Sequence, residues 1–251
     1  MLYSIIPLTF LIINLILNWE LLKNYGFSTK KQDSQNKAHV FYNRFLLAAN
    51  CYFIVDLTWG FFYEYKKGPE FFPLIYSLTV LYFLFMLLTM LTWTLYIVAY
   101  INKSGPRSIV LLYGVWIMFT IGIICLILNP FYPFMFSYND NYEFIGETGR
   151  NISFLLQIAF YTVISTYMLF VAQRSTEYKK IRYKAVALTC IVLGLFLIFQ
   201  IMYAFLPFYA MGLMLGICLI HSFVQANEKK KKKYMTILLL QWQKIMKQYS
   251  T

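Results

Sequence analysis

The sequence predicts an all-α integral membrane protein: a seven-helix bundle with its N-terminus outside the cell and its C-terminus in the cytoplasm. The first observation is composition, because a mean hydropathy of +0.60 with 13% charged residues leaves too little charge to cover a soluble domain of 251 residues. The second is the presence of seven apolar runs near the length of about 20 residues that spans a bilayer. The third is the distribution of Lys and Arg, which favours alternate connecting segments.

Seven apolar runs define the predicted spans. In chain order they cover Leu2–Leu17, Phe45–Tyr63, Phe72–Ile101, Ile109–Leu128, Ile152–Ala172, Ala185–Phe205 and Phe208–Gln225. The first run has no basic residue before it and no small-residue cleavage pattern after it, so we do not expect a cleaved signal. Only Leu206-Pro207 separates the last two runs, which predicts a tight antiparallel pair. Gly212 and Gly216 have the GxxxG spacing that permits close helix approach, either inside the bundle or in a dimer.

Basic residues predict the orientation. The segments after the first, third, fifth and seventh runs contain 19 of the 22 Lys and Arg residues, and the other side holds only Lys66, Lys67 and Arg150. The positive-inside rule places the basic side in the cytoplasm. The net charge of +12 is then explained by topology and by attraction to the anionic lipid of the bilayer, so we expect no nucleic acid partner.

The segment 129–151 is the longest one predicted to lie outside. Two strand-like runs, 134–138 and 142–145, flank the turn Asn139–Asn141, which predicts a short external β-hairpin between the fourth and fifth helices. The aromatic residues Phe131, Tyr138 and Tyr142 are expected to form a lid over an external pocket.

Polar residues within the apolar runs are the candidate binding residues, because ionisable groups in a bilayer are costly. Asp56 lies at a depth similar to that of other polar residues near the outer ends of the runs: Tyr76, Gln157, Gln200 and Tyr203. One interpretation is a ligand pocket open to the outside. The other is that Asp56 accepts hydrogen bonds that hold helices together. His221 in the last run is interpreted as a packing residue or, alternatively, a sensing residue.

Enzymatic activity is not expected. The chain has only two histidines and no H-E-x-x-H, P-loop, G-x-S-x-G or C-x-x-C motif. Asp56 lacks the second carboxylate that dyad chemistry requires. The four cysteines fall inside the apolar runs, which favours buried thiols over disulfides. We therefore expect no catalytic residue, no metal site and no cofactor.

A cytoplasmic extension is predicted after the last run, dividing the chain into a membrane part, 1–227, and a basic segment, 228–251. Its apolar residues follow a two-heptad a/d register: Met235, Leu238, Trp242, Ile245 and Tyr249. One interpretation is a signalling helix that pairs with its copy in a homodimer. The alternative is an amphipathic helix lying on the membrane, since five lysines precede it.

Two segments carry a resemblance to a known family. The step Asn129-Pro130-Phe131 with the following aromatic, acidic and Tyr142 positions, and the stretch Ile198–Asn227, resemble the seven-transmembrane sensor region that precedes bacterial GGDEF diguanylate cyclases and, in relatives, histidine kinases. The resemblance implies a bacterial plasma membrane protein that reads a ligand and passes the signal down the last helix. The chain departs from this pattern because 18 residues follow Lys233 without a GGDEF or kinase motif. A signalling role is therefore expected to need a partner in trans, an unrecognised fusion partner or a truncated gene, and catalysis is not carried over.

Two functions follow as hypotheses. The first is a non-catalytic sensor or receptor for a small amphipathic or weakly cationic ligand, which signals through the last helix to a cytoplasmic partner. The second is a small-molecule or ion transporter with Asp56 and Gln200 in its path. A polar track continuing past Asn50 or toward His221 would favour the transporter, whereas polar residues open only to the outside would favour the receptor.

Overall fold

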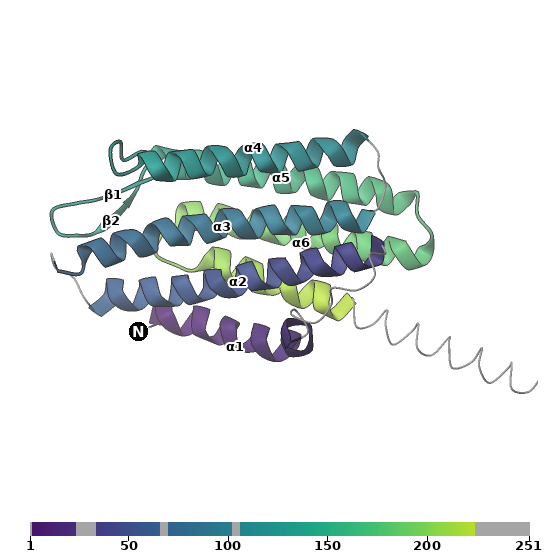
Figure 1. The fold of residues 1–251 in the computed structure, drawn as a ribbon, viewed down its shortest axis with the longest axis horizontal. Coiled ribbons are helices and arrows are strands. Elements are labelled where there is room, and N and C mark those ends of the chain that lie inside the picture. The colour runs from purple at the N-terminus through teal and green to yellow at the C-terminus, as the bar shows by residue number, and fades with distance from the viewer. Residues whose placement is uncertain (1, 24–33, 66–69, 102–105, 224–251) are drawn as a thin grey trace, which may run out of the picture.

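The computed structural model describes residues 2–23, 34–65, 70–101 and 106–223, and its helices run along one common long axis (Figure 1). The helices are α1 (Leu2–Lys23), α2 (Ser34–Tyr65), α3 (Phe72–Ile101), α4 (Pro106–Leu128), α5 (Thr148–Gln173), α6 (Glu177–Met202) and a last described helix, Phe208–Phe223. Two short strands, β1 (Phe136–Tyr138) and β2 (Phe144–Gly146), lie between α4 and α5. The predicted cytoplasmic extension, 228–251, and its heptad residues lie outside the described residues.

Five of these helices are long and apolar enough to cross a membrane, and they identify a helical membrane protein. They are Lys37–Glu64 in α2, then Phe72–Ile101, Ser108–Leu128, Thr148–Gln173 and Lys179–Met202. Two further apolar helices, Tyr3–Trp19 and Phe208–Phe223, are shorter than 18 residues. Their crossing of the membrane, and the orientation of the bundle, stay predictions.

Several helices extend beyond the apolar runs that predicted them. The segment between the first two predicted runs, which end at Leu17 and begin at Phe45, contains the end of α1 at Lys23 and the beginning of α2 at Ser34. Helix α6 begins at Glu177 rather than Ala185 and ends at Met202, three residues before the end of its run. Polar helical turns outside the bilayer carry no apolar signal, so hydrophobicity marks the lipid-embedded part of a helix and misses its polar ends.

The last described helix lies in the core of the bundle. Tyr209 at its start is fully buried, its hydroxyl lies 2.6 Å from Thr89 Oγ1 of α3, and its ring lies 5.1 Å from Tyr52 of α2. A Cβ atom added at Gly212 would lie 2.7 Å from the Cβ of Phe196, and Gly216 is similarly close to α6. The GxxxG pair thus packs inside the bundle, against α6, as the first of the two sequence interpretations proposed.

Helices α4 and α5 present apolar side chains outward. On α4, Ile117 is 58% exposed and Val110 is 68% exposed, and Leu155 on α5 is 59% exposed. Surfaces of this kind are stable only when lipid or protein covers them, which agrees with a bilayer as the surroundings of this chain.

The strands β1 and β2 pair antiparallel in the register Phe136↔Gly146, Ser137↔Ile145 and Tyr138↔Phe144, at one end of the bundle (Figure 1). The side chain of Asn139 closes the turn, because its Oδ1 accepts hydrogen bonds from the backbone N–H groups of Asn141 (3.0 Å) and Glu143 (2.9 Å). The strands are shorter than the predicted runs. Figure 1 places this pair at the end of the bundle opposite the α5–α6 turn, where Arg174 and Lys179 lie.

Asn129 fixes the segment that leads from α4 into β1. Its Oδ1 accepts the N–H groups of Met135 (2.8 Å) and Phe136 (3.3 Å), and its Nδ2 donates to the carbonyl of Phe136 (2.9 Å) and to Tyr76 Oη (3.2 Å). Because Asn129 is buried and fully hydrogen-bonded, it holds β1 in a set position against α3.

Candidate functional site

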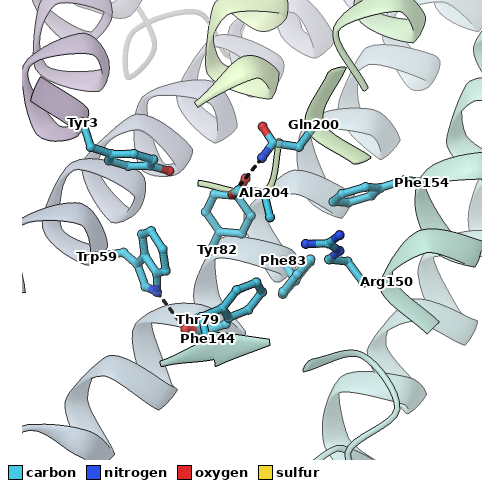
Figure 2. Close-up of a pocket in the computed structure, with 10 residues that line it drawn as sticks. All are labelled: Tyr3, Trp59, Thr79, Tyr82, Phe83, Phe144, Arg150, Phe154, Gln200 and Ala204. Carbon is cyan, nitrogen blue, oxygen red and sulfur yellow. Dashed lines mark hydrogen bonds between the residues drawn. The ribbon is translucent and has the colours of Figure 1, made fainter. Parts of the chain in front are cut away.

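A cavity lies at the end of the bundle where β1 and β2 meet the helices (Figure 2). It is partly open and narrow, with a free volume of about 20 Å³, which is room for about one water molecule. Its lining comes from α1, α2, α3, β2, α5 and the end of α6 with the turn that follows: Tyr3, Trp59, Thr79, Tyr82, Phe83, Phe144, Arg150, Phe154, Gln200 and Ala204. Six of these ten residues are aromatic, so the walls are mainly apolar.

The aromatic wall is built around Trp59 of α2. Its ring lies 5.6 Å from Tyr3 of α1 and 6.1 Å from Phe144 of β2, with an edge-to-face geometry in both pairs. Tyr3 reaches this position because residue 60 is glycine: a Cβ atom there would overlap the Tyr3 ring. Glycine at this position thus lets α1 approach α2 closely beside the cavity.

A hydrogen-bonded chain at the wall connects α2, α3 and β1. Trp59 Nε1 donates to Thr79 Oγ1 (2.9 Å), and Tyr138 Oη lies 2.6 Å from the same oxygen. Since the Thr79 hydroxyl also donates to the carbonyl of Ile75 (2.9 Å), its single proton is used and Tyr138 must be the donor. Burial raises the pKa of Tyr138, so the phenol keeps this proton at neutral pH. β1 is therefore docked on the helices.

Two polar side chains, Arg150 and Gln200, face the cavity from α5 and α6. Arg150 is 7% exposed, and its guanidinium is directed toward the interior of the ring of lining residues (Figure 2). Gln200 Oε1 accepts the backbone N–H of Tyr209 (3.0 Å), and its Nε2 donates to the carbonyl of Ala204 (3.3 Å). Gln200 therefore holds the turn between α6 and the last helix while lining the cavity.

The five predicted ligand-binding residues do not form one pocket. Gln200 alone lines the cavity. Asp56 is fully buried and accepts a hydrogen bond from Tyr3 Oη (2.6 Å), so it reaches the cavity only through Tyr3. Gln157 is buried on α5 and donates to Ser153 Oγ (3.4 Å), whereas Tyr203 is 51% exposed. Tyr76 interacts with Asn129 rather than with the cavity.

The predicted lid also needs correction. Phe131 is 76% exposed and does not line the cavity, and Tyr142 packs on Phe72 with ring centroids 5.5 Å apart. Tyr138 contacts Thr79 in the wall, but the strand residue that lines the cavity is Phe144. Tyr138 and Phe144 are paired across the two strands and therefore lie on the same face, which packs on the helices, whereas Phe131 and Tyr142 lie outside the strands.

Nine of the ten lining residues were not predicted from the sequence, among them Tyr3, Trp59 and Arg150. The signal for Arg150 was present, because it is one of only three basic residues on the side predicted to lie outside. No comparable signal marked the aromatic residues, since aromatic side chains are frequent throughout this chain. In the described ranges, no three His, Cys, Asp or Glu residues gather in a way that could hold a metal ion.

A second polar cluster lies farther along the same helices. Asn14 Nδ2 donates to Asn50 Oδ1 (2.8 Å), Asn18 Nδ2 donates to Asn14 Oδ1 (2.7 Å), and Asn18 Oδ1 lies 3.3 Å from His221 Nδ1. This cluster connects α1, α2 and the last helix. His221 thus contacts a polar partner that the sequence did not indicate.

An apolar layer separates the second polar cluster from the Tyr3–Asp56 pair. On α1, Pro7 and Phe10 come between Tyr3 and Asn14, and on α2 the fully buried Phe53 comes between Asn50 and Asp56. The rings of Phe10 and Phe53 lie 6.1 Å apart. Along the α1–α2 contact the polar residues therefore form two groups rather than one continuous track.

Comparison with known proteins adds no assignment: no protein-family model matches the chain, and the search of curated proteins found no match.

Proposed function

We propose that this chain is a non-catalytic membrane sensor or receptor, which binds a small ligand in the cavity from the outer side and signals through its last helix to a cytoplasmic partner. The proposal rests mainly on one side chain, Gln200, which contacts both the cavity and the last helix. Gln200 lines the cavity and also holds the backbone N–H of Tyr209 at the start of the last helix. A ligand that displaces Gln200 acts directly on that helix.

The contacts of the last helix supply a route away from the cavity. Near its start, Tyr209 is bonded to Thr89 of α3, and near its end His221 meets Asn18 of α1. A ligand shifts such an arrangement only if it binds one arrangement more tightly than another. Here the contact that differs between the two arrangements would be the one between the ligand and Gln200. The response would be a change in the position of His221 and of the segment that follows it.

The resemblance of Asn129–Phe131 and of the stretch Ile198–Asn227 to the sensor region associated with GGDEF proteins supports the same proposal. So does the gathering of Arg174 and Lys179 at the end of the bundle opposite β1 and β2, because the positive-inside rule would place that end in the cytoplasm. The membrane would then be a bacterial plasma membrane, with the cavity open to the outside.

Transport is the second candidate, and the cluster of Asn14, Asn18, Asn50 and His221 favours it. These residues place polar groups farther along the bundle than the cavity, where a path to the other side would need them. The packed Phe10–Phe53 layer stands between the two groups, which favours a receptor, since a path along this contact would require that layer to open.

The test is a ligand screen of the full chain in phosphatidylcholine nanodiscs, read by quenching of Trp59 fluorescence and by thermal unfolding. Compounds that bind the cavity should lose their effect in Ala204→Leu, which fills it, and keep it in Gly194→Ala, whose added Cβ meets open space. Trp59→Phe identifies the quenched fluorophore. A receptor should leave bound compounds outside sealed proteoliposomes, whereas their accumulation inside would establish transport. Binding unaffected by Ala204→Leu would refute the assignment of this cavity.

A further inference from the structure

We propose that the cavity recognises an amphipathic oxyanion, in which a carboxylate or phosphate head binds Arg150 and an apolar body lies against the aromatic wall. This inference rests on the proposed function, because it names the chemical class of the ligand of the same site. It narrows the small amphipathic or weakly cationic ligand expected from the sequence to an amphipathic anion, since the buried carboxylate of Asp56 is not among the lining residues and the guanidinium of Arg150 is.

The position of Arg150 is set by its neighbours. It lies in the first turn of α5, and its Cζ atom lies 5.7 Å from the centroid of the Phe154 ring. Residue 146 in β2 is glycine, and a Cβ atom there would overlap the guanidinium. The glycine therefore leaves room for the guanidinium between β2 and α5, with its long side chain more than nine-tenths buried.

The charge of Arg150 is not neutralised in the part of the chain that the structure describes. Its Nε and Nη2 both donate to Asn151 Oδ1, at 3.2 and 2.9 Å, and this acceptor is an uncharged amide. No hydrogen bond from Nη1 and no ion pair of the guanidinium occurs among these residues. A buried guanidinium without a counter-charge is costly, and a bound anion would relieve this cost.

Among the described residues, neither Glu147 nor Asp56 forms an ion pair with Arg150, and each accepts a hydrogen bond from another donor at one oxygen. Glu147 Oε1 accepts a hydrogen bond from Ser137 Oγ (2.6 Å), and Asp56 Oδ1 accepts one from Tyr3 Oη (2.6 Å). The planar guanidinium of an arginine matches the geometry of carboxylate and phosphate oxygens. The N–H groups of Nη1 are therefore suited to donate hydrogen bonds to the head of an oxyanion ligand. The aromatic wall of Trp59 and Phe144 suits an apolar body, which enters when these side chains move apart, because the free volume of the cavity is about 20 Å³.

Such a ligand could come from two sources, a free molecule or the headgroup of an anionic lipid. The experiment compares both sources on the full chain in nanodiscs. The free probes are 4-phenylbutyrate and its uncharged amide, 4-phenylbutyramide, in phosphatidylcholine alone. The lipid probe is phosphatidylglycerol, added at increasing fractions without a free ligand. The readouts are the thermal unfolding midpoint and the fluorescence of Trp59.

We expect 4-phenylbutyrate, phosphatidylglycerol or both to stabilise the wild-type chain, and the amide to have no such effect. Arg150→Gln should weaken binding by about tenfold or more, the factor that the loss of one charged hydrogen bond produces. Arg150→Lys should retain part of the effect, and it keeps the test informative if Arg150→Gln fails to fold. Arg174→Gln removes the same charge from the other end of α5 and should leave binding unchanged.

The outcomes separate the two proposals. Stabilisation by 4-phenylbutyrate alone assigns a free anion, and stabilisation by phosphatidylglycerol alone assigns a lipid. Equal binding in wild type and Arg150→Gln, or no Arg150-dependent effect of either probe, overturns the anion assignment. If uncharged compounds then still bind and lose binding in Ala204→Leu, the proposed receptor function stands without it. If no compound responds to Ala204→Leu, the receptor function itself fails.

Discussion

The hydrogen bond between Tyr3 and Asp56 gives the most direct test of how α1 is held to the bundle. Asp56 is fully buried, its Oδ1 accepts the Tyr3 hydroxyl at 2.6 Å, and its Oδ2 has no partner among the described residues. Tyr3→Phe removes the only donor that Asp56 has there. A hydrogen bond contributes about 0.5–1.5 kcal/mol between neutral groups and about 1.5–3 kcal/mol to a charged group, so we expect the free energy of unfolding to fall by about 0.5–3 kcal/mol.

The neighbouring residue supplies a matched control. Ser4 Oγ is buried and has no hydrogen-bond partner among the residues that the structure describes, so Ser4→Ala should leave stability unchanged or raise it slightly. Asp56→Asn keeps an acceptor for Tyr3 and removes the buried charge, so we expect the protein to insert and fold. The double variant of Tyr3→Phe and Asp56→Asn then measures the coupling between the two side chains.

Reversible unfolding in mixed micelles, followed by circular dichroism, measures these free energies. A loss in Tyr3→Phe no larger than in Ser4→Ala would refute the reasoning, as would a coupling energy near zero. The same variants test the sequence interpretations of Asp56. Because Asp56 does not line the cavity, the Asp56→Asn variant should bind cavity ligands as the wild type does. Loss of binding in a variant that still folds would show that Asp56 belongs to the binding site.

Two further predictions concern topology and packing. The cysteine of Asp140→Cys, in the turn between β1 and β2, should react with a membrane-impermeant maleimide on intact cells. The cysteine of Ser175→Cys, in the α5–α6 turn, should react only after permeabilisation. The reverse pattern of labelling would show that the proposed orientation is inverted. Gly216→Leu should lower the midpoint of thermal unfolding, because even a Cβ atom there would lie 2.8 Å from Thr189 Cγ2. Gly194→Ala should leave the midpoint unchanged, because its added Cβ meets open space. An unchanged midpoint in Gly216→Leu would show that the contact with α6 is loosely packed.

The sequence was sufficient to predict the long helices and insufficient to predict the cavity. Apolar runs located α3 at Phe72–Ile101 and the end of α4 at Leu128 because lipid-embedded helices have a strong compositional signal. Helical rise gave Asp56, Gln157 and Gln200 similar depths, but depth does not fix the rotation of each helix about its axis. The rotation of each helix about its axis decides which side chains meet, and these three residues lie in different surroundings.

The chemistry of the cavity depends on close approaches that only the assembled fold reveals. Gly60 admits the Tyr3 ring, and Gly146 admits the Arg150 guanidinium, yet each glycine alone resembles any other in a membrane protein. From the sequence, Arg150 is one of only three basic residues on the side predicted to lie outside. Its burial against β2, without an ion-pair partner among the described residues, is what changes the expected ligand from an amphipathic or weakly cationic molecule to an amphipathic anion.

The arrangement also explains how a site at one end of the bundle could influence the other under the proposed function. The last helix is buried along its length through Tyr209, Leu213, Ile217 and Ile220, so it cannot move at its start without repacking against its neighbours. Packed interiors resist small deformations and change between discrete arrangements. Gln200 holds the start of this helix from the cavity wall, and His221 lies beside a cluster of three asparagines near its end. An amide side chain both donates and accepts hydrogen bonds, so the asparagines of this cluster can change partners together. Under the proposed function, we expect the ligand-free and ligand-bound arrangements to differ in these hydrogen bonds.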